Sequence, residues 1–351
     1  MLRLRLLRTY LIASGRMGLF ILLLASVYPA HAEDPTPDEL SNASGDQRYI
    51  EAEFVSSFDR STQPLRYALP PNSKDDKRPV LVFLHSWSSN YHLHKSDWLR
   101  ATLSRGWIFV EPNFRGPNDN PEACGSTAAR ADVLDSVDFA IKHLNADTHR
   151  IYLAGASGGG HMTMLMAARH PERFSAASAW VGISDLEQWY QHHSPGGVPE
   201  KYAKKIAKCC GGAPGASKLV DQQYYQRSPI HWITNVGDLP LDIAAGVRDG
   251  QSGSVPFQHS VRLYNKIAQS HNDPLVSEAE MRQLWENGEL AKPQAQDTAV
   301  DATYGREIKL RRKTDNARLT IFEGGHEGLA EAACAWLEDK HRPTQKSSVD
   351  K

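Results

Sequence analysis

Short apolar runs alternate with amphipathic stretches along most of the chain beyond residue 60. Runs such as RPVLVFLH and HRIYLAG are nearly continuous in apolar residues, which is typical of strands covered on both faces of a parallel sheet. This pattern predicts seven strands, over 64–69, 78–85, 106–112, 149–155, 176–183, 241–247 and 317–323.

Stretches with apolar residues three or four positions apart separate most of these runs. Within 128–145, for example, Leu134, Val137 and Ile141 fall on one helical face. We predict helices over 94–104, 128–145, 158–170, 258–270 and 327–340. Strands that alternate with helices indicate an α/β fold, with helices on both faces of a twisted, mostly parallel sheet. The first strands look like a meander, so we expect a mixed sheet within one domain over 49–343.

Two long stretches interrupt the alternation, at 186–238 and 271–304. The first is rich in Gly, Pro, Lys and aromatic residues, and the second contains an amphipathic helix near 277–290. Long insertions in a compact domain are often lids or binding loops. We therefore expect 186–238 to form a lid before the strand at 241–247, with a purely decorative surface segment as the alternative.

The N-terminus has the pattern of a secretory signal. Arginines at 3, 5, 8 and 16 precede or begin an apolar run that ends in Ala30-His31-Ala32, so we expect cleavage after Ala32 and a secreted or periplasmic protein. The alternative is an uncleaved anchor, although the apolar run is short for a membrane span. No later segment suggests membrane insertion. We expect a flexible leader over 33–48 and a disordered tail over 344–351.

Charge and cysteine content narrow the function further. The 40 basic and 41 acidic residues, four of the former in the signal, leave a slightly acidic mature chain and argue against nucleic-acid binding. The four cysteines lack zinc-site spacing, and we expect neither a metal nor a cofactor. Export permits disulfides, and we expect one between Cys124 and Cys209 or Cys210, with Cys334 as a buried thiol.

The strongest chemical signal is Gly155-Ala156-Ser157-Gly158-Gly159. This G-x-S-x-G motif directly follows a predicted strand and opens a predicted helix, and such a corner exposes a serine hydroxyl at the carboxyl end of the strand. A serine needs a base to accept its proton before it acts as a nucleophile. We therefore expect Ser157 to be the nucleophile of a catalytic triad; the alternative is a structural serine in a glycine-rich turn.

Partners for Ser157 are expected at the same edge of the sheet. His326 follows the last predicted strand within Gly324-Gly325-His326, and Asp249 directly follows the strand at 241–247. An aspartate there can orient the imidazole and stabilise its protonated form. Asp242 and Asp185 are the alternatives. Both are less suitable, because Asp242 lies inside a strand and Asp185 follows an earlier strand. The order Ser, Asp, His is that of α/β-hydrolases.

The remaining site residues are predicted from their positions. We expect the backbone amides of Gly158 and of Trp87, or else Ser86, to form the oxyanion hole. Trp87 follows the strand at 78–85, and its ring is a candidate wall of the substrate site. His85, Arg115 and Trp189 are further candidate substrate contacts, the last because aromatic rings suit sugar or aryl groups.

These motifs together resemble the prolyl-oligopeptidase-like and acetyl-xylan-esterase-like branches of the α/β-hydrolases, over about residues 78 to 337. The resemblance rests on Asn113-Phe114-Arg115-Gly116, the serine motif, Arg227-Ser228-Pro229, Gly246-Val247-Arg248-Asp249, Val255-Pro256, His259-Ser260 and Gly324-Gly325-His326. The chain departs from these relatives in one loop: five residues, Gly250 to Ser254, separate Asp249 from Val255-Pro256, where the family usually has two.

The resemblance implies a serine hydrolase but leaves its substrate open. Peptidases of this group carry a large β-propeller before the hydrolase domain, whereas only about 45 residues separate Ala32 from the strand at 78. We therefore expect an esterase that acts on small esters or on ester-decorated polysaccharide. A peptidase without a propeller is the first alternative, and a non-catalytic binding protein on the same scaffold is the second. The oligomeric state is left open.

Overall fold

The computed structural model describes residues 48–71 and 76–342. Nine strands within these residues form one sheet in the order β1-β2-β4-β3-β5-β6-β7-β9-β8. The pairs β1–β2, β2–β4 and β8–β9 are antiparallel and the other neighbours are parallel. The predicted signal (1–32), most of the leader (33–48) and the tail (344–351) lie outside the described residues.

The seven predicted strands are present, with shifted ends. The strands are β1 (Ile50–Val55), β2 (Thr62–Ala68), β3 (Arg78–Leu84), β4 (Ile108–Pro112), β5 (Ala146–Ala156), β6 (Ala176–Trp180), β7 (Leu241–Gly246), β8 (Ile308–Lys313) and β9 (Ala317–Phe322). Strands β4, β6 and β7 are buried along their whole length, which explains their continuous apolar sequences.

The sequence pattern does not predict β1 and β8, the two edge strands. In β1 the exposed residues include Glu51 and Glu53, and charged residues protect an edge from pairing with other chains. In β8, Arg311 and Arg312 are buried through ion pairs with Asp301, Asp297 and Glu280. Buried arginines hide the apolar pattern on which the prediction depends.

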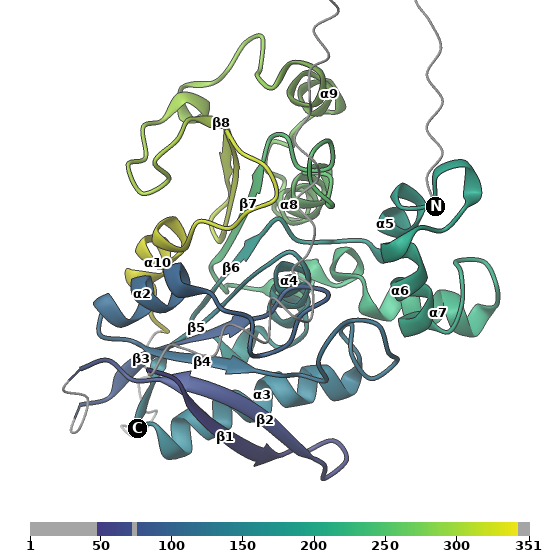
Figure 1. Ribbon diagram of the computed structural model, residues 1–351. Coiled ribbons are helices and arrows are strands. Elements are labelled where there is room, and N and C mark those ends of the chain that lie inside the picture. The colour runs from purple at the N-terminus through teal and green to yellow at the C-terminus, as the bar shows by residue number, and fades with distance from the viewer. Residues whose placement is uncertain (1–47, 72–75, 343–351) are drawn as a thin grey trace, which may run out of the picture. The chain divides into compact units, whose positions relative to one another are not determined.

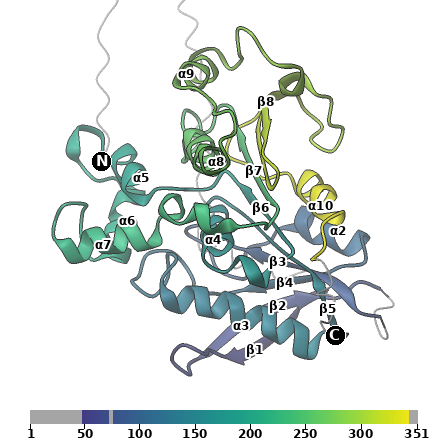
Figure 2. The same ribbon diagram turned by 180° about the vertical axis from the view of Figure 1, so that it is seen from behind.

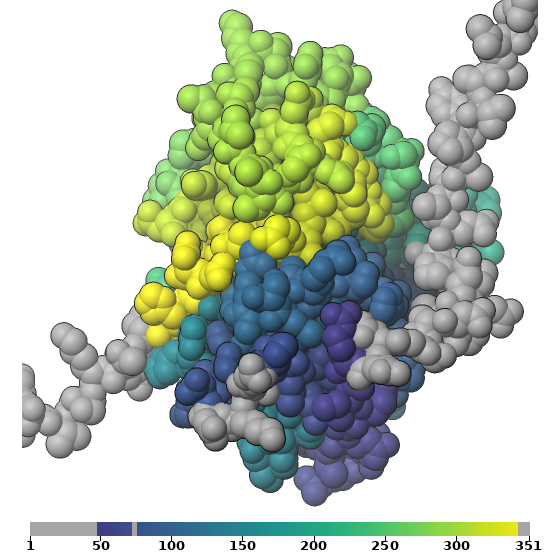
Figure 3. Space-filling view, turned by 60° about the vertical axis from the view of Figure 1, so that its left-hand side comes forward, coloured from purple at the N-terminus to yellow at the C-terminus, as the bar shows by residue number. Residues whose placement is uncertain are grey.

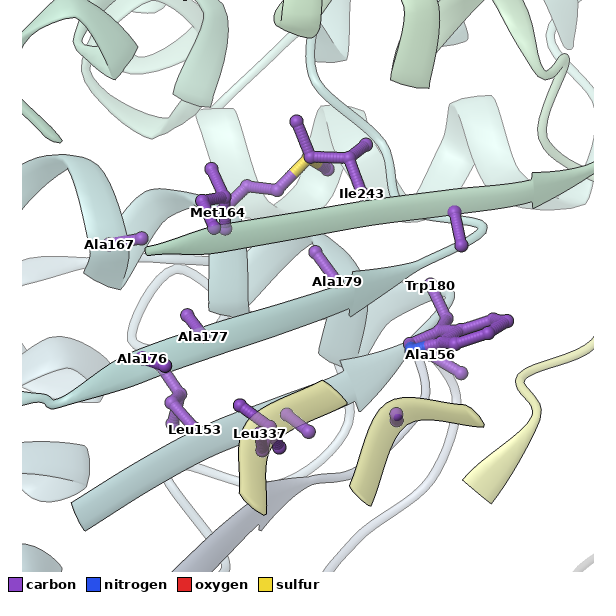
Figure 4. Packing of buried hydrophobic residues seen from close by; sticks show 14 of the residues in the cluster. Leu153, Ala156, Met164, Ala167, Ala176, Ala177, Ala179, Trp180, Ile243 and Leu337 are labelled. Carbon is purple, nitrogen blue, oxygen red and sulfur yellow. The ribbon is translucent and has the colours of Figure 1, made fainter. Parts of the chain in front are cut away.

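Helices cover both faces of the sheet, as expected. They are α2 (Ser96–Ser104), α3 (Thr127–His143), α4 (Gly158–Arg169), α8 (Gln258–His271) and α10 (Ala330–Glu338). Helices α2 and α10 lie side by side in both ribbon views (Figure 1, Figure 2), and the space-filling view shows the C-terminal residues in yellow against the blue residues around α2 (Figure 3). Figure 4 shows Met164 of α4 and Leu337 of α10, which pack against the central strands from the two faces of the sheet.

The two insertions are mostly helical. The first contains α5 (Leu186–His192), α6 (Lys201–Cys210) and α7 (Lys218–Arg227), which extend to one side of the sheet in Figure 1. Their apolar residues form a second hydrophobic cluster with Trp87, Cys124 and Val255. The second insertion contains the predicted helix as α9 (Glu278–Asn287), whose first turn is closed by a capping box between Ser277 and Glu280. The first insertion thus packs against the loops at the carboxyl edge of the sheet.

Candidate active site

Ser157 lies at the sharp corner between β5 and α4. Its φ angle is 59°, in the left-handed region that residues other than glycine rarely adopt. The Ser157 amide donates to the Trp180 carbonyl at 2.9 Å, which ties the corner to β6. A methyl group on Gly159 would lie 2.0 Å from the Leu84 carbonyl oxygen, so only glycine allows α4 to start this close to β3. Ser157 is half-buried at this corner.

His326 and Asp249 form a direct hydrogen bond. The Nδ1 atom of His326 lies 2.8 Å from one carboxylate oxygen of Asp249 and 3.0 Å from the other. Asp249 is fully buried and also accepts from the Val255 amide at 3.2 Å, whereas the His326 side chain is 24% exposed. Burial raises the pKa of Asp249, and the hydrogen bond from His326 opposes that rise. The predicted contact between these two side chains is therefore present.

The two alternative aspartates have other partners. Asp242 accepts from Arg318 at 2.7 Å and from Ser178 at 2.9 Å inside the sheet. Asp185 caps α5 by accepting from the amides of Glu187 and Gln188. Of the three aspartates weighed from the sequence, Asp249 is the one that contacts the imidazole.

The amides of Gly158 and Trp87 lie close together. A methyl group on Gly158 would lie 2.4 Å from the Trp87 amide nitrogen and 3.0 Å from the Ser86 carbonyl carbon. The loop after β3 therefore runs directly over the first residue of α4, where helix amides point toward a developing negative charge. The Trp87 ring turns inward instead. Trp87 is 1% exposed, and its ring packs edge-on against that of Trp189, with 4.7 Å between the ring centroids. The expectation that this ring forms an open wall of the site is wrong.

His85 is buried beneath the site. Its two ring nitrogens lie 3.0 Å from the Ser86 carbonyl oxygen and 2.9 Å from that of Asn113, and its ring stacks on Phe114. Burial lowers the pKa of His85. Its surroundings assign it to holding two loops together, so the suggested substrate contact is wrong.

Arg115 and Trp189 are also interior residues. The Arg115 guanidinium is 5% exposed and makes ion pairs at 2.7 Å with Asp132 and Asp59. Trp189 is fully buried, and its indole nitrogen donates to the Ser254 carbonyl at 2.7 Å. Neither side chain reaches a surface where a substrate would contact it, which corrects both suggestions. The motif around Arg115 and the aromatic content around Trp189 reflect packing.

The four cysteines are free thiols and all are buried. The expected disulfide from Cys124 is therefore not formed, although the two partners do meet: the hydrogen bond between Cys124 and Cys209, together with burial, raises the pKa of the Cys209 thiol. Both residues belong to the cluster beneath the first insertion, where they fill apolar space. Cys334 is the buried thiol expected in the last helix, and burial raises its pKa to about 12.

Sequence reasoning missed Ser254, which contacts the imidazole. The Ser254 hydroxyl oxygen lies 3.3 Å from Nε2 of His326. The Ser254 carbonyl accepts from Trp189 and, at 2.9 Å, from Nε2 of His193. The one available signal was the length of the loop Gly250–Ser254, which, from the sequence, we expect to be longer than is usual for the family. Length alone did not reveal which residue would meet His326.

Two further observations concern metal binding and membrane insertion. In residues 48–71 and 76–342, no three His, Cys, Asp or Glu side chains gather in a way that would hold a metal ion. No helix in the part of the chain that the structure describes is long and apolar enough to cross a bilayer.

Comparison with known proteins identifies the family. The model of the prolyl oligopeptidase family of peptidases matches residues 94–282, more than half of the chain. This match includes Ser157 and Asp249 and ends before His326. The chain therefore belongs to the prolyl oligopeptidase family.

Its relatives include both esterases and peptidases. Feruloyl esterase B of Neurospora crassa is 31% identical over 63% of this chain and 68% of its own length. Acetylxylan esterase A of Emericella nidulans is 41% identical over 43% of this chain and 49% of its own length. Acylamino-acid-releasing enzyme 1 of rice is 28% identical over 59% of this chain, but the alignment spans only 26% of the rice protein.

Solved structures support the fold. Oligopeptidase B from Leishmania major aligns with a TM-score of 0.54 over 83% of this chain and 35% of its own, at 14% identity. With the mostly parallel sheet and the serine corner, this similarity shows an α/β-hydrolase fold, as predicted.

Proposed function

We propose that this chain is a serine hydrolase in which Ser157, His326 and Asp249 form the catalytic triad. The observation that carries the proposal is the strained corner at Ser157 on the same sheet edge as the hydrogen-bonded pair of His326 and Asp249. Strain at one residue persists where the surrounding structure enforces it, and it concentrates at functional sites. The match to the prolyl oligopeptidase family supports the same reading.

The proposed reaction proceeds through an acyl-enzyme. Nε2 of His326 accepts the proton of Ser157 as the hydroxyl oxygen attacks the carbonyl carbon of the substrate. Asp249, hydrogen-bonded to Nδ1, fixes the tautomer and stabilises the imidazolium that forms. The amides of Trp87 and Gly158 donate to the oxyanion. His326 then protonates the leaving alcohol, and water attacks the acyl-enzyme with His326 again as the base.

We propose carboxylic esters as the substrates, in particular acyl or aryl esters attached to carbohydrate. The support comes from the two fungal relatives, a feruloyl esterase and an acetylxylan esterase, whose aligned residues are 31% and 41% identical to this chain, against 28% for the rice enzyme. Ester cleavage also demands less of His326 as a general acid, because an alkoxide leaves more readily than an amide nitrogen.

A peptidase is the second candidate. The matching family model is that of a peptidase family, and the rice relative is named for the release of acylamino acids. The same triad can cleave esters and amides, so only the measured substrate preference distinguishes an esterase from a peptidase.

We also propose that the protein is exported. The support is the N-terminal pattern of arginines, a short apolar run and Ala30-His31-Ala32. N-terminal sequencing of the protein recovered from outside the cytoplasm should begin at Glu33. A protein that is retained in the cytoplasm with its first residues intact would contradict this.

The experiment that tests the proposed function is a comparison of kcat/KM on p-nitrophenyl acetate, methyl ferulate, acetylated xylan and an acetylaminoacyl anilide. We expect the esters to exceed the anilide by several orders of magnitude. The Ser157→Ala variant, with an unchanged circular dichroism spectrum, should lose about 10⁶-fold in kcat. Comparable kcat/KM on the anilide would favour the peptidase, and no activity on any of them would contradict both candidates.

A further inference from the structure

The loop Gly250–Ser254 is built against the proposed catalytic pair. A methyl group on Gly253 would lie 2.3 Å from an Asp249 carboxylate oxygen and 2.6 Å from Cβ of His326. On either side of Ser254, therefore, the chain touches this pair, since the next amide, of Val255, donates to Asp249. This loop therefore places both its backbone and the Ser254 side chain directly against His326 and Asp249.

The position of Ser254 is fixed from the first insertion. Its carbonyl accepts two hydrogen bonds, from the indole of Trp189 at 2.7 Å and from the imidazole of His193 at 2.9 Å. Trp189 is fully buried and packs against Trp87. Two donors on one carbonyl hold the residue in place, so its hydroxyl stays close to His326. On its other side the loop is tied to α9, because Nε2 of the Gln251 side chain donates to the Trp285 carbonyl at 2.5 Å.

The direction of the Ser254 hydrogen bond follows from the tautomer. Nδ1 of His326 faces a carboxylate, which accepts only, so Nδ1 carries the proton in the neutral ring. Nε2 then has one lone pair and no proton. The Ser254 hydroxyl, 3.3 Å away, is the donor to that lone pair. This lone pair is the one that must accept the proton of Ser157.

We propose that Ser254 is a positioning residue that holds His326 in the free enzyme by competing with Ser157 for Nε2. This inference rests on the proposed triad. In the described residues, the hydroxyl that contacts Nε2 is that of Ser254, and no hydrogen bond joins Nε2 to Ser157. Proton transfer from Ser157 therefore requires the bond with Ser254 to break. One hydrogen bond of this kind changes an equilibrium by roughly two- to tenfold.

The test is the rate at which a fluorophosphonate labels Ser157, measured from about pH 5 to pH 9 for four proteins. These are the wild type, Ser254→Ala, Ser254→Thr and the matched control Ser252→Ala. Ser252 lies on the same exposed turn, and its hydroxyl bonds the Arg248 carbonyl at 3.4 Å. A fluorophosphonate reacts with the nucleophile itself, so its rate reports on Ser157 and its base without the binding of a natural substrate.

We expect Ser254→Ala to label roughly two- to tenfold faster than the wild type, because the competing donor is gone. The acidic limb of its pH profile should also move to higher pH, since the neutral ring loses a partner. Ser254→Thr, which keeps a hydroxyl, and Ser252→Ala should both follow the wild type. The other charged or titratable groups around His326 are the same in all four proteins: Asp249, Arg248, Glu323, Glu327, Arg306, His192 and His193.

Two results would overturn the inference. Ser254→Ala that matches Ser252→Ala in rate and in pH profile would show that the contact does not restrain His326. Ser254→Ala that labels more slowly than the wild type would show that the hydroxyl assists the base. Failure of the triad itself would look different, because then the wild type would not be labelled at Ser157 at all.

Discussion

The two ends of strand β7 each carry a fully buried aspartate, and the two aspartates have different kinds of partner. Asp242 near the start of the strand pairs with Arg318, which stays charged at any pH the protein experiences. Asp249 just beyond the end of the strand pairs with His326, which can gain and lose a proton. The first pair is suited to holding the sheet, and the second to chemistry.

Surroundings also differ between the two ends. Around Asp242 the partners come from neighbouring strands, Ser178 of β6 and Arg318 of β9, so the pair is part of the sheet. Around Asp249 they come from loops, including the Val255 amide. Of two buried aspartates near one strand, we therefore propose a structural role for Asp242 and a catalytic role for Asp249, on the chemistry of their partners.

The largest expected effect concerns activity at the Asp249 end. Asp249→Asn should lower kcat on p-nitrophenyl acetate by about 10⁴-fold, because the amide favours the wrong tautomer of His326. Its thermal unfolding should stay close to that of the wild type. Asp242→Asn is the matched control and should keep nearly the full kcat. Equal losses of kcat in the two variants would show that Asp249 and Asp242 do not differ in role.

For the free energy of unfolding we expect the reverse order, with the larger loss in Asp242→Asn. Asp242→Asn leaves the Arg318 guanidinium, itself 12% exposed, without its carboxylate. Removing one partner of a buried ion pair costs about 3 to 5 kcal/mol, so the free energy of unfolding should fall by about that amount. Urea unfolding followed by tryptophan fluorescence measures it. A loss below about 1 kcal/mol would show that Asp242 is not needed by the sheet.

Gly246 tests how closely the Asp249 end must be held. A methyl group there would lie 2.2 Å from the Gly325 carbonyl oxygen, one residue before His326. Gly246→Ala should push the two loops apart and lower kcat by about 10²-fold, as expected for a displacement of about 1 Å. Measuring kcat of Gly246→Ala and of the wild type as a function of pH reports this loss. Unaltered kcat would mean that the His326 loop adjusts without cost.

The smallest effect is a difference in pH dependence. Because burial raises the pKa of Asp249 above its ordinary value of 3.8, this carboxyl stabilises the fold most at low pH, and that contribution is lost as the pH rises through the folded-state pKa. As the pH rises above about 4, where the unfolded carboxyl ionises before the folded one, the wild type should therefore lose more unfolding free energy than Asp249→Asn. Parallel curves for the two proteins would contradict the assigned direction.

The sequence predicted the part of the site that depends on strand ends. Ser157, Asp249 and His326 each follow a buried apolar strand, and strand ends in a parallel sheet meet at one edge. The edge strands were missed because Glu51, Glu53, Arg311 and Arg312 interrupt or obscure the apolar pattern.

Contacts between distant loops were harder to predict. The sequence suggests His85, Arg115 and Trp189 as substrate contacts, yet each is held by partners far away in the sequence, such as Asn113 for His85 and Ser254 for Trp189. Ser254 was missed for the same reason. Periodicity reports which residues are buried, but it does not report which buried polar groups meet.

The central claim is that Ser157 is the nucleophile, and covalent labelling tests it most directly. After reaction with a fluorophosphonate, the intact mass should increase by one reagent adduct, and peptide sequencing should place the adduct on Ser157. The Ser157→Ala variant, folded like the wild type, should show no mass increase. An adduct on another residue, or labelling of Ser157→Ala at the wild-type rate, would contradict the account.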